Sequence, residues 1–289
     1  MLTLLNTTAS ILKLRISLFI ALAALVGLAT GQRVLDVAEA TVFCLAVLGA
    51  SCAAGGFNQY YERDTDRLMA RTAGRPFASG QLQPGAVWPV TFLALLSASV
   101  LMAWSVGGSL AALFVFLGAA TYGLVYTVWL KKRSVWNVVI GGAAGSFALL
   151  AGAAAAGPSV EPSAWLLALV LFLWTPPHFW SLAAARQDDY RNASVPMLPA
   201  VTAASQWAPM IFAHVAALVA LSLAPLWFGF GAIYGVFAGV GGAVFLMASW
   251  RLMRAPGAAT AMLTFHASLT HFALLALGVL LDEGVRWVV

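Results

Sequence analysis

The chain is predicted to be an all-α, polytopic integral membrane protein that forms a single domain over residues 1–289. Hydrophobic residues make up 62% of the sequence and charged residues only 9%, a composition far from that of a soluble globular domain. Apolar windows of about twenty residues, long enough to cross a bilayer, recur along the whole chain. Because no polar segment between them is long enough to fold alone, one transmembrane domain accounts for the sequence.

Nine apolar windows, bounded by charges, glycines and prolines, are predicted to be membrane-spanning helices. They lie at residues 16–35, 39–59, 86–106, 109–130, 137–157, 163–185, 207–228, 231–250 and 262–281. A count of eight is the alternative, because the connection at Gly229-Phe230-Gly231 is short. Lys13 and Arg15 precede the first window, and no small-residue cleavage signature follows it, so we interpret it as a span rather than a signal peptide.

The distribution of basic residues predicts the orientation of these spans. If the N-terminus is cytoplasmic and the C-terminus is outside, thirteen of the fifteen Lys and Arg residues fall on the cytoplasmic side. The net charge of +5 is therefore interpreted as an orientation signal in a lipid bilayer, and no nucleic-acid partner is expected. The absence of an Arg- and Ser-rich presequence favours a bacterial plasma (inner) membrane.

The polar stretch 58–76 follows the second window and contains three of the ten acids and four of the fifteen bases. Asn58, Glu62 and Asp66 recur every four residues, so on a helix they line one face. Their amide and carboxylate oxygens are ligands that Mg²⁺ shares with a phosphate-bearing substrate. The alternative is a solvated loop that merely anchors two helices, as most charge runs do.

Basic residues near this stretch are the predicted contacts for an anionic group. Arg63, Arg67 and Arg71 repeat the spacing of four on an adjacent stripe, and guanidinium groups suit phosphate oxygens. Three consecutive bases, beginning with Lys131 and Lys132, follow the fourth window. Such a run is typical of a topology signal, but next to acidic loops it could also hold an anionic leaving group.

The sixth window contains Pro176 and Pro177, which we predict to break its hydrogen-bond ladder beside a cavity. His178 follows the break in the company of Trp174. An ionisable residue inside a span is a candidate for function, and a packing role is the alternative.

A second acidic region, Asp188-Asp189, follows the sixth window. Two acidic regions on the cytoplasmic side, with bases between them, describe a divalent-metal diphosphate site. Metal ions and bases would neutralise a departing diphosphate, so that an allylic carbon could ionise. Aromatic faces could stabilise the carbocation, and a water-poor pocket would protect it.

These residues resemble the intramembrane aromatic prenyltransferase (UbiA-type) superfamily. The pattern Asn58-x-x-x-Glu62-x-x-x-Asp66 is similar to its first acidic motif, which usually has Asp at the middle position. Further stretches resemble its protohaem IX farnesyltransferase branch. They are Arg71-Thr72-x-x-Arg75-Pro76, Tyr126-Thr127-x-x-Leu130-Lys131-Lys132, Trp174-x-Pro176-Pro177-His178-Phe179 and Asp189-Tyr190 followed by Pro196-x-Leu198-Pro199.

The resemblance covers roughly residues 10–280. It implies about nine helices around a central prenyl-diphosphate cavity and a Mg²⁺-dependent enzyme whose active site faces the cytoplasm. The implied reaction transfers the farnesyl group of farnesyl diphosphate to the vinyl group of haem B, with addition of water, and gives haem O and diphosphate. Haem B would be a substrate rather than a cofactor. A haem-A synthase or a terminal-oxidase assembly protein is the partner that this activity implies.

Carried over to this chain, the resemblance implies that Asn58, Glu62, Asp66 and Asp189 are catalytic residues and metal ligands. The implied substrate-binding residues are Arg63, Arg67, Arg71, Tyr126, Lys131, Lys132, Trp174, His178 and Asp188. Alanine stands at Ala185, where the second motif of the superfamily would require an acid. We expect either that Asp188 substitutes for it or that only one metal ion is firmly held. His178 is hypothesised to contact the haem, as an axial ligand or a propionate partner.

Two other functions fit parts of the sequence. The same fold could act on a phenolic or quinone-precursor acceptor such as 4-hydroxybenzoate, but the sequence offers no additional clamp for a small acid. An ion-coupled transporter would use the acids as ion sites, but transporters often show internal repeats and midplane charges. Here the acids cluster at one predicted face, and no clear repeat is present.

Overall fold

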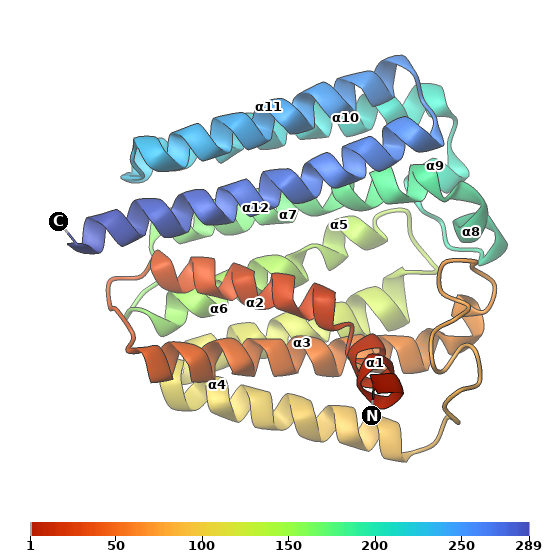
Figure 1. Cartoon of the computed structure of the whole chain (residues 1–289), viewed down its shortest axis with the longest axis horizontal. Coiled ribbons are helices and arrows are strands. Elements are labelled where there is room, and N and C mark those ends of the chain that lie inside the picture. Colours follow the sequence, from red (N-terminus) through yellow and green to blue (C-terminus); the bar gives the residue numbers. More distant parts are fainter. Residues whose placement is uncertain (1, 289) are drawn as a thin grey trace.

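A computed structural model describes the backbone of residues 2–288 and the side chains of residues 6–285. Within this range every regular element is a helix, which confirms the predicted all-α class. The long helices lie side by side along one direction (Figure 1). The elements are α1 (Leu2–Ile11), α2 (Leu14–Ala29), α3 (Val37–Asp66), α4 (Val87–Ala120), η1 (Thr121–Leu130), α5 (Asn137–Gly141), α6 (Ala143–Ala155), α7 (Pro162–Ala185), α8 (Gln187–Asn192), α9 (Leu198–Val201), α10 (Ala204–Ser222), η2 (Ala224–Phe228), α11 (Ala232–Arg254) and α12 (Ala258–Val288).

Among the described residues, seven helical segments are long and apolar enough to cross a membrane, and α2 is a shorter apolar helix. They overlap all nine predicted windows, so the chain is a multi-pass membrane protein. Individual bounds differ: the first window was expected to reach residue 35, but α2 ends at Ala29. The second window was expected to end at residue 59, but α3 continues to Asp66. The count of nine spans and the N-in, C-out orientation stay predictions.

The longest apolar segment, Val87–Leu130, turns back on itself at Gly108, whose φ of 72° is in the region that favours glycine. A Cβ on Gly56 would lie 2.4 Å from the Phe92 ring, and one on Gly123 would lie 3.7 Å from the Phe57 ring. Residues 92 and 123 therefore lie at the same level of α3, although a straight helix would separate them by about 46 Å. The windows 86–106 and 109–130 form an antiparallel pair.

The contact between α2 and α6 depends on glycine. A Cβ on Gly27 would lie 1.9 Å from the carbonyl oxygen of Leu149, and one on Gly152 would lie 2.0 Å from that of Ala24. No side chain fits at such distances, so the two backbones are in direct contact, as in other small-residue interfaces of membrane helices. Window 137–157, which contains α6, is rich in glycine and alanine, and such small residues permit this close approach.

As predicted, Pro176 and Pro177 interrupt the hydrogen-bond ladder of their span, since neither has a backbone N–H, and α7 nevertheless runs through both from Pro162 to Ala185. A proline ring removes one backbone N–H and leaves the carbonyl four residues earlier without its helical donor. For Pro177 that carbonyl belongs to Leu173, and His214 of α10 forms a hydrogen bond with it. A neighbouring helix thus satisfies the freed group, and α7 stays continuous.

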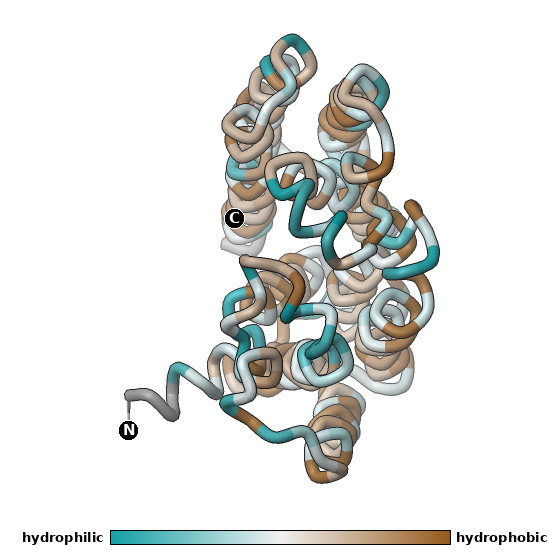
Figure 2. The backbone as a smooth tube through the Cα atoms, turned by 90° about the vertical axis from the view of Figure 1, so that its right-hand side faces the viewer, coloured by the Kyte–Doolittle hydropathy of each residue, from teal (hydrophilic) through white to brown (hydrophobic). Residues whose placement is uncertain are grey.

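The polar connections gather at one end of the bundle. The loop after α3 and the short helices α8 and α9 lie at the right-hand end of Figure 1, and α12 ends at the other end. Figure 2 looks onto the right-hand end, where most of the loops nearest the viewer are hydrophilic. The two predicted acidic regions are therefore at the same end of the molecule.

Candidate functional site

Helix α3 places Asn58, Glu62 and Asp66 on one face of its C-terminal half. Their exposed fractions are 1%, 4% and 1%. The solvated-loop alternative does not describe them, since a surface anchor would leave such side chains in water. Burying two carboxylates is costly unless each has a charged or hydrogen-bonding partner.

Each of these three side chains meets a base from a different part of the chain. Lys13 donates from Nζ to Oδ1 of Asn58. Lys131 donates from Nζ to Oε2 of Glu62 at 2.5 Å. Arg75 donates from Nη1 to both carboxylate oxygens of Asp66, at 2.9 and 2.7 Å. The face is therefore a set of compensated charges and polar groups.

Lys13 reaches this face from the corner between α1 and α2. Its backbone is left-handed, with φ 46° and ψ 44°, a conformation that is uncommon for a residue with a side chain. Its Nζ also donates to the Tyr122 hydroxyl at 2.8 Å and lies 5.5 Å from the centre of that ring. Burial, and next the positive charge of Arg75, lower the pKa of Lys13 well below its usual range.

The loop after α3 joins the second acidic region to the first. The backbone N–H of Ala70 donates to Oδ1 of Asp189 at 2.8 Å. Within the loop, Thr72 donates from its hydroxyl to the carbonyl oxygen of Asp66 at 3.0 Å. The other carboxylate oxygen of Asp189, Oδ2, is buried and has no hydrogen-bond partner among the described residues. A buried carboxylate oxygen without a partner is a candidate ligand atom.

The oxygens on these two elements fit a divalent cation that is held largely through its substrate. Among the described residues, no three His, Cys, Asp and Glu side chains gather into a metal-ligand set of their own. Mg²⁺ does not require such a cage, because it commonly uses one or two carboxylates, waters and substrate phosphates. The donor set of Asn58, Glu62, Asp66 and Asp189, with Oδ2 of Asp189 unpaired, has the chemistry that this mode of binding needs.

The predicted stripe of arginines is not formed, because α3 ends at Asp66 and the helical spacing stops there. Arg63 bonds the carbonyl oxygen of Tyr60 at 2.8 Å and lies over that ring. Arg67 bonds the carbonyl oxygen of Ala78 at 2.8 Å. Arg71 and Lys132 are exposed. Contact of these residues with a diphosphate stays a prediction.

Asp188 is not brought together with the other acids. Its side chain is 92% exposed and lies 3.7 Å from the guanidinium of Arg191, one turn further along α8. Asp189, the next residue, is buried. Successive residues of a helix point in different directions, so only one of the pair can face the bundle.

Tyr126 lies on η1, a π-helical segment in which the backbone bonds span five residues, as from Lys131 N to Tyr126 O at 2.9 Å. π-Helical segments are rare in proteins, and those that do occur are often found at functional sites. The ring of Tyr126 stacks on Tyr122 with centroids 5.9 Å apart, and Nζ of Lys131 lies 5.7 Å from its centre. The segment supplies two aromatic faces, and Lys131, the base that meets Glu62, directly follows it.

Trp174 and His178 lie in an aromatic cluster between α7 and α12. The His178 ring is stacked between Trp174, at 4.3 Å, and Phe265, at 4.5 Å. Trp174 donates from Nε1 to the carbonyl oxygen of Ser268 at 2.8 Å. The aromatic neighbour expected next to His178 is therefore present, and α12 adds the ring of Phe265.

The hydrogen bonds of Ser268 assign the tautomer of His178. The Ser268 hydroxyl donates its one proton to the carbonyl oxygen of Phe265 at 2.5 Å, and His178 Nδ1 lies 2.6 Å from the same oxygen, Oγ. Oγ must then accept a proton from Nδ1. In the neutral ring this leaves Nε2 unprotonated, with a lone pair that no described residue engages.

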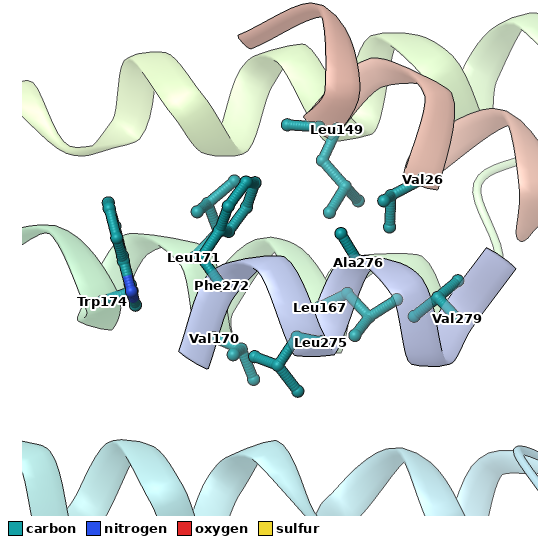
Figure 3. A pocket seen from close by; sticks show the side chains of 11 residues that line it. Val26, Leu149, Leu167, Val170, Leu171, Trp174, Phe272, Leu275, Ala276 and Val279 are labelled. Carbon is teal, nitrogen blue, oxygen red and sulfur yellow. The ribbon is translucent and has the colours of Figure 1, made fainter. Parts of the chain in front are cut away.

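Close to this aromatic cluster lies an apolar pocket between α2, α6, α7 and α12 (Figure 3). Trp174 and Phe272 belong to its lining, and their ring centroids are 5.5 Å apart. The rest of the lining is aliphatic, and Figure 3 shows Leu149, Val26 and Val279 pointing into the same space. The pocket therefore offers apolar surface beside His178.

Several residues of the candidate site were not selected from the sequence, among them Lys13, Arg75 and Tyr122 near the acids and Phe265 and Ser268 next to His178. Arg75 was visible inside the motif that ends at Pro76, and its place in that motif was the available signal. Lys13 was interpreted only as a charge before the first span. Its contact with Asn58 joins residues 45 positions apart, which spacing along one helix cannot indicate.

Residues 17–279 match the UbiA prenyltransferase family. The chain is 52% identical to "Protoheme IX farnesyltransferase 2" of Paramagnetospirillum magneticum, over 96% of this chain and 97% of that protein. It is 44% identical to "Protoheme IX farnesyltransferase 1" of the same organism, over 94% and 96%.

Two solved structures have a similar fold at low sequence identity. A digeranylgeranylglyceryl phosphate synthase superposes with a TM-score of 0.78 at 17% identity, covering 96% of this chain and 98% of that one. A UbiA homologue from Archaeoglobus fulgidus, bound to DMAPP and Mg²⁺, superposes with a TM-score of 0.72 at 17% identity, covering 93% and 99%. The helical arrangement is therefore that of the UbiA structures.

Proposed function

Because this chain belongs to the UbiA prenyltransferase family, among the protoheme IX farnesyltransferases, we propose that it converts haem B to haem O. The farnesyl group of farnesyl diphosphate is transferred to a vinyl group of haem B, water is added, and diphosphate is released. The observation that carries the proposal is the buried face of Asn58, Glu62 and Asp66, each meeting a base, in a chain with this 52% identical relative.

The reaction needs a site that attracts a diphosphate and then stabilises it as it leaves. The C–O bond between the farnesyl C1 and the diphosphate breaks, and a bond forms between C1 and the terminal vinyl carbon. A water molecule gives its hydroxyl to the other vinyl carbon and releases a proton. Lys131 and Arg75 are placed to donate to diphosphate oxygens, because both lie at the buried acids with N–H groups to spare.

Mg²⁺ is the cofactor that we propose, since its charge would help to neutralise the leaving diphosphate. Asn58, Glu62, Asp66 and Asp189 would hold it through their side-chain oxygens. The unpaired Oδ2 of Asp189 and the oxygen-only donor set support this assignment. A UbiA homologue of the same fold has been solved with DMAPP and Mg²⁺ bound, which also supports the assignment of Mg²⁺.

Aromatic residues stand where a cationic farnesyl group would need them. Tyr122 and Tyr126 present stacked rings next to the acids, and Trp174 presents its ring at the apolar pocket. Ring faces attract cations, and an apolar surrounding keeps water from the carbocation until the new bond forms. We assign part of the isoprenoid tail to the apolar pocket of Figure 3.

His178 is the proposed contact for haem B. Its unprotonated Nε2 suits an iron ligand, because neutral imidazole binds metals through the nitrogen that carries no proton. The ring is stacked between Trp174 and Phe265, so its plane is fixed. Ser268 holds the other nitrogen and so determines which nitrogen is free.

The proposed location is the bacterial plasma membrane, with the active site on the cytoplasmic side. The basic residues of the loops after α3 and η1 support this side, since cytoplasmic loops carry the excess of Lys and Arg. We further propose that haem O is passed to a haem-A synthase or terminal-oxidase assembly partner, because haem is too apolar to leave the bilayer freely.

The test is an extraction of haems from membranes that contain the native chain, Asp66→Ala or the control Asp64→Ala, separated by chromatography and identified by mass. Asp64 is on the same helix, but its side chain is 69% exposed. Haem O is expected with the native chain and the control, and is expected to be absent with Asp66→Ala. Haem B alone in all three, from folded protein supplied with farnesyl diphosphate and Mg²⁺, would refute the proposal, and prenylation of a phenolic acid would favour the alternative acceptor.

A further inference from the structure

We infer that Lys13 is a diphosphate-binding residue that, in the substrate-free protein, occupies the oxygen of Asn58 assigned to the metal. The inference rests on the proposed function and extends it to a residue outside every motif that carries the family resemblance. Lys13 would exchange partners during binding, from the amide of Asn58 to an oxygen of the substrate diphosphate.

The orientation of the Asn58 amide is assigned by its neighbours. Thr127 donates its single hydroxyl proton to the carbonyl oxygen of Tyr122 at 2.8 Å. The same hydroxyl lies 2.8 Å from Nδ2 of Asn58 and must accept a proton from it. Oδ1, the only side-chain oxygen of Asn58, is therefore the atom turned toward Lys13.

An ammonium group and a divalent cation compete for that oxygen. Both need its lone pairs, and their positive charges repel each other at the short distances that ligation and hydrogen bonding require. When Asn58 ligates a metal ion, Nζ of Lys13 has to move away. The bound diphosphate then offers the strongest hydrogen-bond acceptors in the site. Nζ of Lys13 can turn to one of its oxygens, because the charge is carried on a flexible four-carbon chain.

The backbone of Lys13 is held against α3, so that only the side chain needs to move. Gln59 of α3 donates from Nε2 to the carbonyl oxygen of Ser10, at the end of α1. A Cβ on Gly55 would lie 3.4 Å from Cβ of Lys13, so the corner packs directly on the small residues of α3. A left-handed non-glycine residue persists where its surroundings enforce it, and such positions are frequent at ligand contacts.

This arrangement predicts two opposite effects of removing the Lys13 charge. Without a competing ammonium group, a divalent ion alone should bind more tightly. Without a donor for the diphosphate, the substrate should bind more weakly. A residue that only stabilises the α1–α2 corner could not produce opposite signs, because loosening the corner would weaken both kinds of binding or neither.

The experiment measures both affinities on purified full-length protein. Mn²⁺ serves as the paramagnetic probe of the metal site, with free and bound ion separated by electron paramagnetic resonance. Farnesyl thiodiphosphate, a slowly reacting analogue, serves as the diphosphate probe and is titrated by calorimetry in the presence of Mn²⁺. The proteins are the native chain, Lys13→Met, Lys13→Arg and the control Arg15→Met, whose exposed side chain lies two residues away.

For Lys13→Met we expect Mn²⁺ alone to bind several-fold more tightly and the analogue to bind about ten- to one-hundredfold more weakly, the range for a hydrogen bond to a charged group. Lys13→Arg should restore most of the affinity for the analogue, and Arg15→Met should match the native chain. If Lys13→Met does not fold, Lys13→Gln, which is uncharged but can still donate to Asn58, takes its place.

The outcomes separate this inference from the proposed function. If the native chain does not bind farnesyl thiodiphosphate with Mn²⁺, the proposed function is refuted and the inference with it. If the native chain binds both probes but Lys13→Met behaves like Arg15→Met, or loses both affinities together, only the role of Lys13 is overturned. Opposite shifts in the two affinities support it.

Discussion

Removing Arg75 from its ion pair with Asp66 is expected to lower the stability more than removing the charge of Asp66. The side chain of Asp66 is 2% exposed and that of Arg75 is 20% exposed. Arg75→Met leaves a buried carboxylate without its partner, which should lower the free energy of unfolding by about 3 kcal/mol, the low end for a broken buried pair. Asp66→Asn leaves a guanidinium that water can reach, and should cost only about 1 kcal/mol.

The double variant Arg75→Met/Asp66→Asn tests the same reasoning from the other side. It removes both charges, so it should be more stable than Arg75→Met alone. Unfolding in mixed micelles with increasing sodium dodecyl sulfate, followed by tryptophan fluorescence, would give the free energies of all four proteins. A larger loss for Asp66→Asn than for Arg75→Met, or strictly additive losses in the double variant, would refute the argument from burial.

Three further predictions concern the haem contact, the helix packing and the metal. His178→Ala should abolish the haem-dependent change in the visible spectrum. Ser268→Ala should weaken haem binding several-fold, because either nitrogen of the His178 ring could then carry the proton; spectroscopic titration measures both effects. Gly27→Val should reduce the yield of folded protein, because its Cβ would lie 1.9 Å from a backbone oxygen of α6, whereas Gly239→Val, with nothing within 4 Å, should express normally. Chelation of divalent ions should remove the thermal stabilisation produced by farnesyl diphosphate, and added Mg²⁺ should restore it; stabilisation that persists in the chelator would contradict the metal assignment.

The helical fold was predictable because hydropathy acts locally. A window of apolar residues fixes a span wherever lipid is the solvent, so α7 and α11 begin or end within a few residues of the predicted bounds. The tertiary details were less accessible. At Pro177 the bond to the freed carbonyl of Leu173 comes from His214 of another helix, and the turn within Val87–Leu130 lies at Gly108, where the backbone leaves the helical region.

In the candidate site, too, only the residues that share one helix were predictable from the sequence. The face of Asn58, Glu62 and Asp66 follows from a period of four along one helix, which a sequence displays directly. The residues that complete it do not share that helix. Lys13 comes from the corner before α2, and Ser268, which orients His178, comes from α12. Contacts between residues tens of positions apart have no periodicity, so they become visible only when the chain is folded.

The failure of the arginine stripe shows what the loop after α3 does instead. Three residues of the short segment 70–75 bond the acids: the N–H of Ala70 donates to Asp189, the hydroxyl of Thr72 donates to the backbone carbonyl of Asp66, and Arg75 donates to the Asp66 carboxylate. Had α3 continued as a helix, its backbone N–H groups would have been used within the helix and none could have reached Asp189. Because α3 ends at Asp66, the segment that follows can bond both Asp66 and Asp189, two acids far apart in the sequence.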